Sequence, residues 1–306
     1  MNRPMAKRTK MEWAEMQTRQ QRAVERAAEV LEALKFASAP IDPLAIIASE
    51  KPLLCATGGN FRNRFDGQLE YHRSKNRFLL FFNTKYDRAP NGEHQPRTRF
   101  SIAHELGHYF LDAHQAYLRR TGKSHPSRGE FLSDRNIETE ADAFAAGLLM
   151  PASLLGPRVN DGEMCFADIQ AWAGDFKTSV TSTARRAVEL SDFPCALIGV
   201  REGRVAFSFQ SQAMIEGGCY PRLRGSALPP GAQAKWQAFT SGCLLEKEGQ
   251  SLARAWCQTY DNDRADGAPV SEHYFGVPPT QTLLVLLTIP EEALFPDDDD
   301  DSDDED

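Results

Sequence analysis

The chain has 306 residues, 41% of them hydrophobic and 25% charged, which suffices for one large or two modest domains with buried cores. No stretch approaches the roughly 18 consecutive apolar residues of a membrane helix, and the N-terminus lacks the apolar segment of a signal peptide. The formal net charge of −8 comes from the end of the chain: 297–306 hold nine acids, and the remainder carries 35 basic and 34 acidic residues. Composition thus argues against a membrane protein, and we expect 297–306 to be a disordered acidic tail.

Cysteine usage points to a reducing compartment. The six cysteines are scattered along the chain, and none belongs to a Cys-x-x-Cys pair. Such thiols are usually reduced and buried in cytosolic proteins, so we expect a cytoplasmic protein. The cysteines are Cys55, Cys165, Cys195, Cys219, Cys243 and Cys257.

The first predicted element is an amphipathic helix over residues 13–36. Val24, Ala27 and Leu31 repeat at helical spacing and would give this helix one apolar face. We treat 1–35 as an N-terminal helical segment that precedes the main domain.

Two short strands and a helix are predicted next. Residues 67–72 alternate between apolar and polar, 78–83 form an apolar run rich in β-formers, and 73–76 are typical of a hairpin turn. A polar loop over 89–96 leads into a helix that Thr98 could cap. In this order of strand, loop and helix, an edge strand would bind an extended peptide beside the helix.

The predicted helix contains His104-Glu105-Leu106-Gly107-His108, the most informative motif in the chain. Side chains four residues apart lie on one face of a helix, so both imidazoles can reach a single cation. Glu105 would then lie beside a water on that cation, placed to take its proton. The pattern is a signature of zinc peptidases. Gly107 costs the helix about 1 kcal/mol, which indicates a close neighbour at that position.

A hydrolytic zinc centre needs a third protein ligand, commonly Glu, His or Asp. Residues 137–150 predict a second helix, on which Glu138 and Asp142 share one face. We assign Glu138 as the third metal ligand and Asp142 as the carboxylate that holds a ligand imidazole in the correct tautomer. Glu140, which points to another face, is the competing ligand. The small side chain of Ala141 would let the two helices approach closely.

Two longer motifs resemble the ImmA/IrrE family of metallo-endopeptidases. They are Arg99-Phe-Ser-Ile-Ala-His-Glu-Leu-Gly-His108 and Glu138-x-Glu-Ala-Asp-x-Phe-Ala-Ala-x-Leu-Leu-Met-Pro151. Asn83, at the end of an apolar strand, also fits the family, and the likeness continues through 176–186 and 191–196. The resemblance therefore covers about residues 36–210.

The resemblance implies a thermolysin-like fold with gluzincin-type zinc ligands. It also implies cleavage of a DNA-binding repressor, which relieves transcriptional silencing in mobile-element or stress regulation. One zinc ion held by His104, His108 and Glu138 would polarise the scissile carbonyl, and Glu105 would act as general base. The residue that stabilises the oxyanion stays open among His114, His125, His273, Tyr71 and Tyr109.

The rest of the chain predicts a helical connector and a second module. Residues 161–190 look like a helix-turn-helix, but with one arginine pair and no basic stripe we do not expect direct nucleic-acid binding. Two strands, 195–200 and 204–210, flank a turn at 201–203, and 282–289 form a continuous apolar strand, buried on both faces or central in a sheet. The stretch 217–267 predicts no function.

We therefore expect an α+β fold: a thermolysin-like zinc-peptidase core followed by a helical connector and a C-terminal α+β module. The expected segments are 1–35, the peptidase domain 36–160, the connector 161–190, the module 191–296 and the tail 297–306. The expected function is a zinc endopeptidase acting on a protein substrate of the helix-turn-helix repressor class. The alternatives are a metal-binding regulatory or antitoxin-type protein with little proteolysis, and a DNA-binding regulator.

Overall fold

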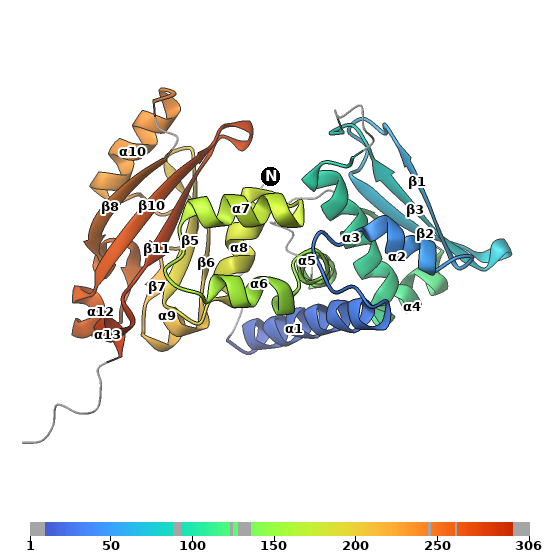
Figure 1. Ribbon diagram of the computed structural model, residues 1–306, viewed down its shortest axis with the longest axis horizontal. Coiled ribbons are helices and arrows are strands. Elements are labelled where there is room, and N and C mark those ends of the chain that lie inside the picture. Colours follow the sequence, from blue (N-terminus) through green and yellow to red (C-terminus); the bar gives the residue numbers. More distant parts are fainter. Residues whose placement is uncertain are drawn as a thin grey trace, which may run out of the picture. The chain divides into compact units, whose positions relative to one another are not determined.

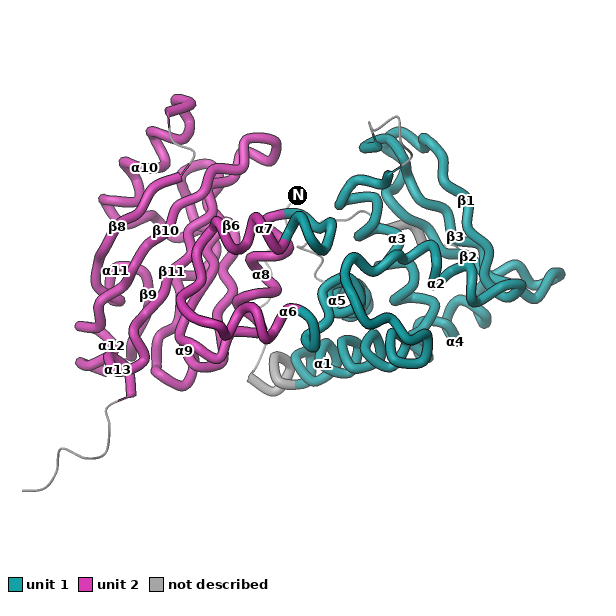
Figure 2. Tube along the Cα trace, viewed as in Figure 1, with its two compact units in different colours: residues 1–154, 173–179 teal, residues 155–172, 180–306 magenta. Residues whose placement is uncertain are grey.

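The computed structural model describes residues 10–87, 93–122, 125–127, 136–243, 246–260 and 262–295. The expected acidic tail at 297–306 lies outside them. The fold is mixed helix and sheet, as the sequence predicted (Figure 1). The chain forms two compact units: unit 1 comprises 1–154 and 173–179, and unit 2 comprises 155–172 and 180–306 (Figure 2). The N-terminal helix belongs to unit 1, and the expected connector is shared between the units.

Unit 1 contains a layer of helices beside a small sheet. Its helices are α1 (Lys10–Ala33), α2 (Pro43–Ser49), α3 (Pro96–Phe110), α4 (Asp112–Thr121) and α5 (Asn136–Leu149). Its strands are β1 (Leu54–Gly59), β2 (Gly67–His72), β3 (Arg77–Asn83) and β4 (His125–Ser127), with a short 3-10 turn at Arg73–Lys75 between β2 and β3.

The sheet of unit 1 has the order β1-β3-β2-β4. The strands β2 and β3 form the predicted antiparallel hairpin, and Asn76 closes its turn in the left-handed region with φ 46°. The buried side chains of Leu69, Phe78 and Leu80 lie on these two strands, and α3 packs against both (Figure 1). The sheet thus supports the helix that carries the His-Glu-x-x-His motif.

The sequence predicted that the strand before the loop at 89–96 lies at the edge of the sheet. This prediction is wrong, because that strand is β3. β3 lies between β1, to which it is parallel, and β2, to which it is antiparallel. The sequence hid this because a parallel partner is distant in the chain and leaves no turn signal. The edges are β1 and the three-residue β4, which pairs with Gly67–Leu69 of β2.

The predicted cap of α3 is also wrong. The helix begins at Pro96, whose fixed φ and missing N–H suit the first helical position. Gln95 is the capping residue and makes no side-chain hydrogen bond to the helix. Thr98 lies inside the first turn, where its hydroxyl donates to Asp87 Oδ1 at 2.8 Å.

The helices α3 and α5 approach each other closely at Gly107. A Cβ at this position would lie 3.1 Å from Cα of Ala141 and 3.2 Å from Cβ of Phe144. The close neighbour that Gly107 indicated is therefore the backbone of α5, and the small Ala141 admits it as expected. On its other side α5 packs along α1, where a Cβ at Gly147 would lie 3.2 Å from Cγ1 of Val24.

Unit 2 combines helices with a larger sheet. Its helices are α6 (Ala152–Val159), which begins in unit 1, α7 (Phe166–Phe176), which the units share, α8 (Val180–Leu190), α9 (Gln212–Glu216), α10 (Pro230–Thr240), α11 (Ala253–Trp256), α12 (Asp263–Gly267) and α13 (Glu291–Leu294). Its strands are β5 (Cys195–Arg201), β6 (Arg204–Gln210), β7 (Tyr220–Pro221), β8 (Glu246–Leu252), β9 (Cys257–Gln258), β10 (Pro269–Val277) and β11 (Thr282–Thr288).

The main sheet of unit 2 is antiparallel, with the order β6-β5-β11-β10-β8. The predicted hairpin of β5 and β6 is confirmed, and its turn places Glu202 and Gly203 at φ 53° and 70°. The continuous apolar strand β11 lies at the centre of the sheet, and six of its seven residues are buried. Its neighbour β10, which the sequence did not predict, alternates buried and partly buried residues instead.

Two arginines of α8 turn inward rather than forming a basic surface. Arg185 Nε donates to Glu189 Oε1 at 2.7 Å, and its guanidinium lies 4.4 Å from the ring centroid of Phe209 on β6. Arg186 is buried and pairs with the same glutamate at 3.4 Å. Both charges are therefore engaged inside unit 2.

Two features of the described residues bear on the expectations from composition and cysteine usage. No helix among them is long and apolar enough to cross a lipid bilayer. All six cysteines lie in described segments and are free thiols.

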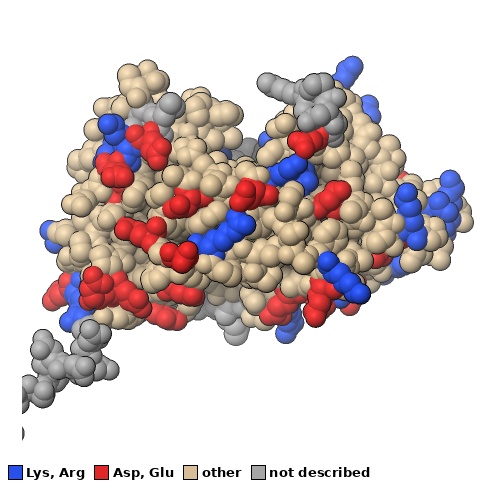
Figure 3. Space-filling view, viewed as in Figure 1, with Lys and Arg blue, Asp and Glu red and all other residues tan. Residues whose placement is uncertain are grey.

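Basic side chains gather at the right-hand end of the molecule in Figure 3, over the turn between β2 and β3 that contains Arg73 and Lys75.

Candidate metal centre

His104 and His108 lie one turn apart on α3 and face the same way. Their Nε2 atoms are 3.1 Å apart, and their ring planes cross at 74°. Both side chains are buried, with 4% and 1% of His104 and His108 exposed. The helical spacing therefore brings two imidazole nitrogens together in a site shielded from bulk water.

Glu138, in the first turn of α5, supplies the third group. Its Oε2 lies 3.5 Å from Nε2 of His104, and its Oε1 lies 3.8 Å from Nε2 of His108. One potential ligand atom from each of these side chains lies within 4.8 Å of the other two.

The spacing of the three groups fits a small divalent cation. Tetrahedral zinc with bonds of about 2.0–2.1 Å separates its ligand atoms by about 3.3 Å, close to the distances between the imidazole and carboxylate atoms. Two imidazoles and one carboxylate are also a donor set that zinc accepts while keeping a fourth position open. The residues present therefore fit a catalytic type of zinc site.

Asp142, one turn after Glu138 on α5, holds the far side of the His104 ring. Its Oδ1 is 2.8 Å from His104 Nδ1, which leaves Nε2 of His104 directed at His108 and Glu138. We call the group of His104, His108 and Glu138 the cluster. Burial disfavours the charged ring, but the hydrogen bonds with Asp142 and Glu138 outweigh it and raise the pKa of His104 to about 10. A metal ion that binds Nε2 of His104 would have to displace the proton which this raised pKa favours on the ring.

Glu105 is fully buried under the first residue of β2. A Cβ at Gly67 would lie 2.5 Å from Oε1 of Glu105 and 2.8 Å from its Cγ, so the carboxylate occupies space that any other residue at position 67 would claim. Asn83 braces the loop that leads into β2: its amide donates to the carbonyls of Arg62 and Phe65, both at 2.7 Å. The backbone of β2 thereby limits where Glu105 can lie.

The competing candidate, Glu140, contacts other side chains, His114 and Arg19. Its Oε2 is 3.1 Å from Nε2 of His114, and Arg19 of α1 donates to its Oε1 at 3.4 Å. The hydrogen bond with His114 and the charge of Arg19 outweigh burial and lower the pKa of Glu140. Of the two candidates, only Glu138 directs its carboxylate to both His104 and His108.

His114 is not available as an oxyanion donor. It is buried, its Nε2 faces Glu140, and its Nδ1 lies 3.0 Å from Nδ1 of His108. Helical spacing could not reveal this contact, because α3 ends at Phe110 and the chain bends at Leu111 before α4 begins.

The hydroxyls of the two tyrosines considered as oxyanion donors form hydrogen bonds with other side chains. Tyr109 donates its hydroxyl to Glu50 Oε2 at 2.8 Å, and Tyr71 donates to Asn76 Oδ1 at 2.6 Å. Burial, with that bond to Glu50, raises the pKa of Tyr109. The remaining candidates are His125, whose side chain lies outside the described residues, and His273 on β10 of unit 2.

The two helices bring the His-Glu-x-x-His motif and Glu138 together as a possible metal site beside a small sheet. Residues 89–187 match the model of the family Peptidase_M78, described as the IrrE N-terminal-like domain. This segment includes both helices that carry the candidate ligands. Residues 89–187 are therefore an IrrE N-terminal-like domain, in agreement with the resemblance found in the sequence.

A solved structure supports the fold over most of the chain. A Mycobacterium tuberculosis transcriptional regulator superposes with a TM-score of 0.53 at 13% identity, covering 89% of this chain and 89% of that one. At this identity the match concerns the fold alone. No curated protein sequence matches the chain significantly.

Proposed function

We propose that this protein is a zinc-dependent endopeptidase that hydrolyses a peptide bond in a protein substrate. The observation that carries the proposal is the convergence of His104, His108 and Glu138, with Glu105 buried beside them. The family match adds support, because Peptidase_M78 domains are associated with zinc and peptide hydrolysis.

In this proposal His104, His108 and Glu138 hold the ion, and Asp142 fixes the His104 ring so that Nε2 faces it. When bound, the ion supplies Lewis acidity, which polarises the scissile carbonyl and lowers the pKa of the attacking water. Glu105 accepts a proton from that water and passes it to the leaving amine.

The position of Glu105 favours an enzyme over a metal-binding regulator without proteolysis. A binding module needs ligands, but it has no use for a buried carboxylate next to them that is not itself a ligand. Glu105 is fully buried beside the imidazoles, and the missing side chain at Gly67 leaves room for its carboxylate there. An acid–base role accounts for this arrangement.

The proposed substrate is a DNA-binding repressor of the helix-turn-helix class, and the proposed setting is transcriptional control in the cytoplasm. The substrate class comes from the likeness to the ImmA/IrrE family. The compartment is supported by six free cysteines in the described segments. The rival reading, direct DNA binding through the connector, finds no support in α8, whose Arg185 and Arg186 pair with Glu189.

The test compares the zinc-loaded wild type with Glu105→Gln. Each is incubated with a proteome-derived peptide library and with a purified repressor encoded beside its gene, and new N-termini are read by mass spectrometry. We expect stoichiometric zinc in both proteins, but cleavage only by the wild type, with a loss of at least about 100-fold in the variant, because a positioned general base contributes that much.

Chelation of the metal should abolish the same cleavages. Equal cleavage by the wild type and Glu105→Gln would contradict the proposal. A wild type that holds zinc and cleaves neither the library nor the repressor would leave the regulatory metal-binding alternative in its place.

A further inference from the structure

The two histidines of the motif are supported in different ways. Nδ1 of His104 faces a carboxylate, Asp142, at 2.8 Å. Nδ1 of His108 instead faces Nδ1 of a third histidine, His114, at 3.0 Å. His114 lies in the first turn of α4, and its own Nε2 is 3.1 Å from Oε2 of Glu140 on α5.

The direction of these hydrogen bonds follows from the ligand role of His108. Between two imidazole nitrogens at hydrogen-bond distance, one donates and the other accepts. Nε2 of His108 faces Nε2 of His104 and the Glu138 carboxylate, so a metal there needs its lone pair and the ring proton must sit on Nδ1. Nδ1 of His114 is then the acceptor.

Glu140 faces the other ring nitrogen of His114. A neutral His114 that accepts through Nδ1 carries its proton on Nε2, and this N–H points at Glu140. A carboxylate offers only acceptors, so it suits this tautomer and opposes the other. Arg19 on α1 donates to the second oxygen of Glu140, which holds the carboxylate in place.

We propose that His114 and Glu140 are positioning residues for the metal ion: they hold His108 in the tautomer that presents Nε2 to the cluster. A merely structural role explains the contacts less well, because an apolar pair of similar size would fill this buried place without desolvating an imidazole and a carboxylate. The proposal rests on the metal centre of the proposed function, but not on peptide hydrolysis.

The test uses the full-length protein and zinc alone as the ligand. His114→Leu removes the acceptor, whereas His114→Asn places an amide oxygen near the position of Nδ1. We expect competition with a chromogenic chelator to show a roughly 10- to 100-fold loss of zinc affinity in His114→Leu. His114→Asn should recover most of that loss, and Glu140→Leu should lose affinity as His114→Leu does.

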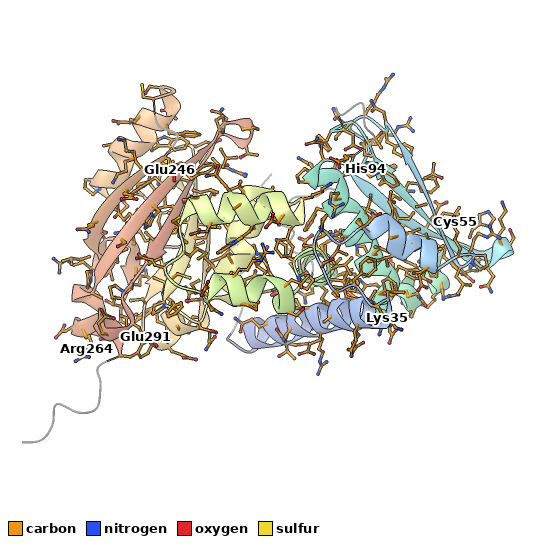
Figure 4. The ribbon with its side chains drawn as sticks, in the orientation of Figure 1. Lys35, Cys55, His94, Glu246, Arg264 and Glu291 are labelled. Atoms are coloured by element: carbon orange, nitrogen blue, oxygen red, sulfur yellow. The ribbon has the colours of Figure 1, made fainter. Side chains whose placement is uncertain are left out.

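His94 gives a matched control in the same unit. Its Nδ1 lies 2.7 Å from Oδ2 of Asp87, so it too is a histidine paired with a carboxylate. It precedes α3 (Figure 4) and is not one of the three clustered side chains. His94→Leu should bind zinc as the wild type does.

A spectroscopic measurement on the wild type covers the case in which the His114 variants fail to fold. In the zinc-loaded protein, ¹⁵N NMR of the imidazoles should show His108 protonated on Nδ1 and His114 protonated on Nε2. A proton on Nδ1 of His114 would overturn the proposal, and so would a folded His114→Leu that binds zinc as tightly as the wild type.

The outcomes separate this inference from the proposed function. If the wild type binds zinc with the expected tautomers yet cleaves nothing, the endopeptidase proposal fails and the positioning role stands. If His114→Leu binds zinc and cleaves as the wild type does, the positioning role fails and the endopeptidase proposal stands. A wild type without zinc affinity overturns both.

Discussion

Gly67 determines where the carboxylate of Glu105 can lie, because β2 crosses directly over it. In Gly67→Ala the new Cβ would collide with Oε1 and Cγ of Glu105, and the carboxylate would have to move. We expect zinc affinity to be unchanged and peptide hydrolysis to fall by about 100-fold, since a displacement near 1 Å can cost that much. The measurements are chelator competition and steady-state cleavage.

Gly174→Ala is the control for this prediction. Gly174 lies on the part of α7 that belongs to unit 1, and a Cβ there would meet nothing within 4 Å. A Gly67→Ala protein that cleaves as fast as Gly174→Ala would show that the position of Glu105 is not limiting.

At the residue scale, the sequence predicted the part of the site that follows from helical spacing. His104 and His108 are one turn apart on α3, and Glu138 shares a face of α5 with Asp142. His114 could not be assigned in this way, because it reaches His108 across the bend between α3 and α4. The role of Gly67 depends on a strand crossing a helix, which no local pattern reports.

The pairing of α3 with α5 is the element-scale feature on which the metal cluster depends. Two candidate ligands come from α3 and the third from α5, so the separation of the helices sets the distance between Glu138 and the imidazoles. Gly107→Val would press a branched side chain against Ala141, at a cost of about 1–3 kcal/mol in unfolding free energy. We expect it to lower zinc affinity as well as thermal stability.

Gly147→Val tests whether the loss of affinity comes from the α3 side. Gly147 lies on α5, the helix that Gly107 of α3 contacts, but it faces Val24 and Ala27 of α1. This variant should lose a comparable amount of stability while the folded protein keeps its zinc affinity. Equal loss of affinity in the two variants would mean that the helix separation is not the cause.

Elements with a local signature were predictable, and elements defined by distant partners were not. In the hairpins of β2 with β3 and of β5 with β6, the turn residues lie between the two strands in the sequence. The strand β11 is recognisable from its continuous apolar run. By contrast, β1 and β8 pair with strands that do not follow them directly, because β2 lies between β1 and β3, and α11, β9 and α12 lie between β8 and β10. β8 is also largely polar, because it is an edge strand with little burial.

At the scale of the whole molecule, unit 2 has a core of its own with a buried carboxylate inside it. Glu272 accepts from Trp256 Nε1 and from the Tyr274 hydroxyl, both at 2.6 Å. Burial favours the neutral acid, but the nearby Ser251, the hydrogen bonds from Tyr274 and Trp256 and the charge of Lys235 lower the pKa of Glu272 below its ordinary value. The ionised form therefore stabilises the fold.

Glu272→Gln should destabilise unit 2 at neutral pH by about 1–3 kcal/mol, because a charged acceptor of two buried donors is lost. The ionised Glu272 contributes fully above the ordinary pKa of about 4.3, and its contribution disappears as the pH falls through the lowered folded value. Urea unfolding should thus separate variant and wild type at pH 7 and not in strong acid. Zinc affinity in unit 1 should not change.

Glu246→Gln is the matched control, since Glu246 is an exposed glutamate on β8, the strand beside β10 (Figure 4). It should unfold as the wild type does at both pH values. A gap between wild type and Glu272→Gln that persists in strong acid would contradict the role given to the ionised carboxylate.

The packing of α1 limits how the chain can be shortened for laboratory use. A fragment starting at residue 36 would keep every candidate ligand, and it would look like a convenient minimal catalytic piece. It would also strip α5 of the helix that covers one of its sides, and Ala23, Ala27, Val30 and Leu31 of that helix are buried in the intact chain. The bared apolar strip would promote aggregation, so truncated preparations should be insoluble even though the ligands are all present.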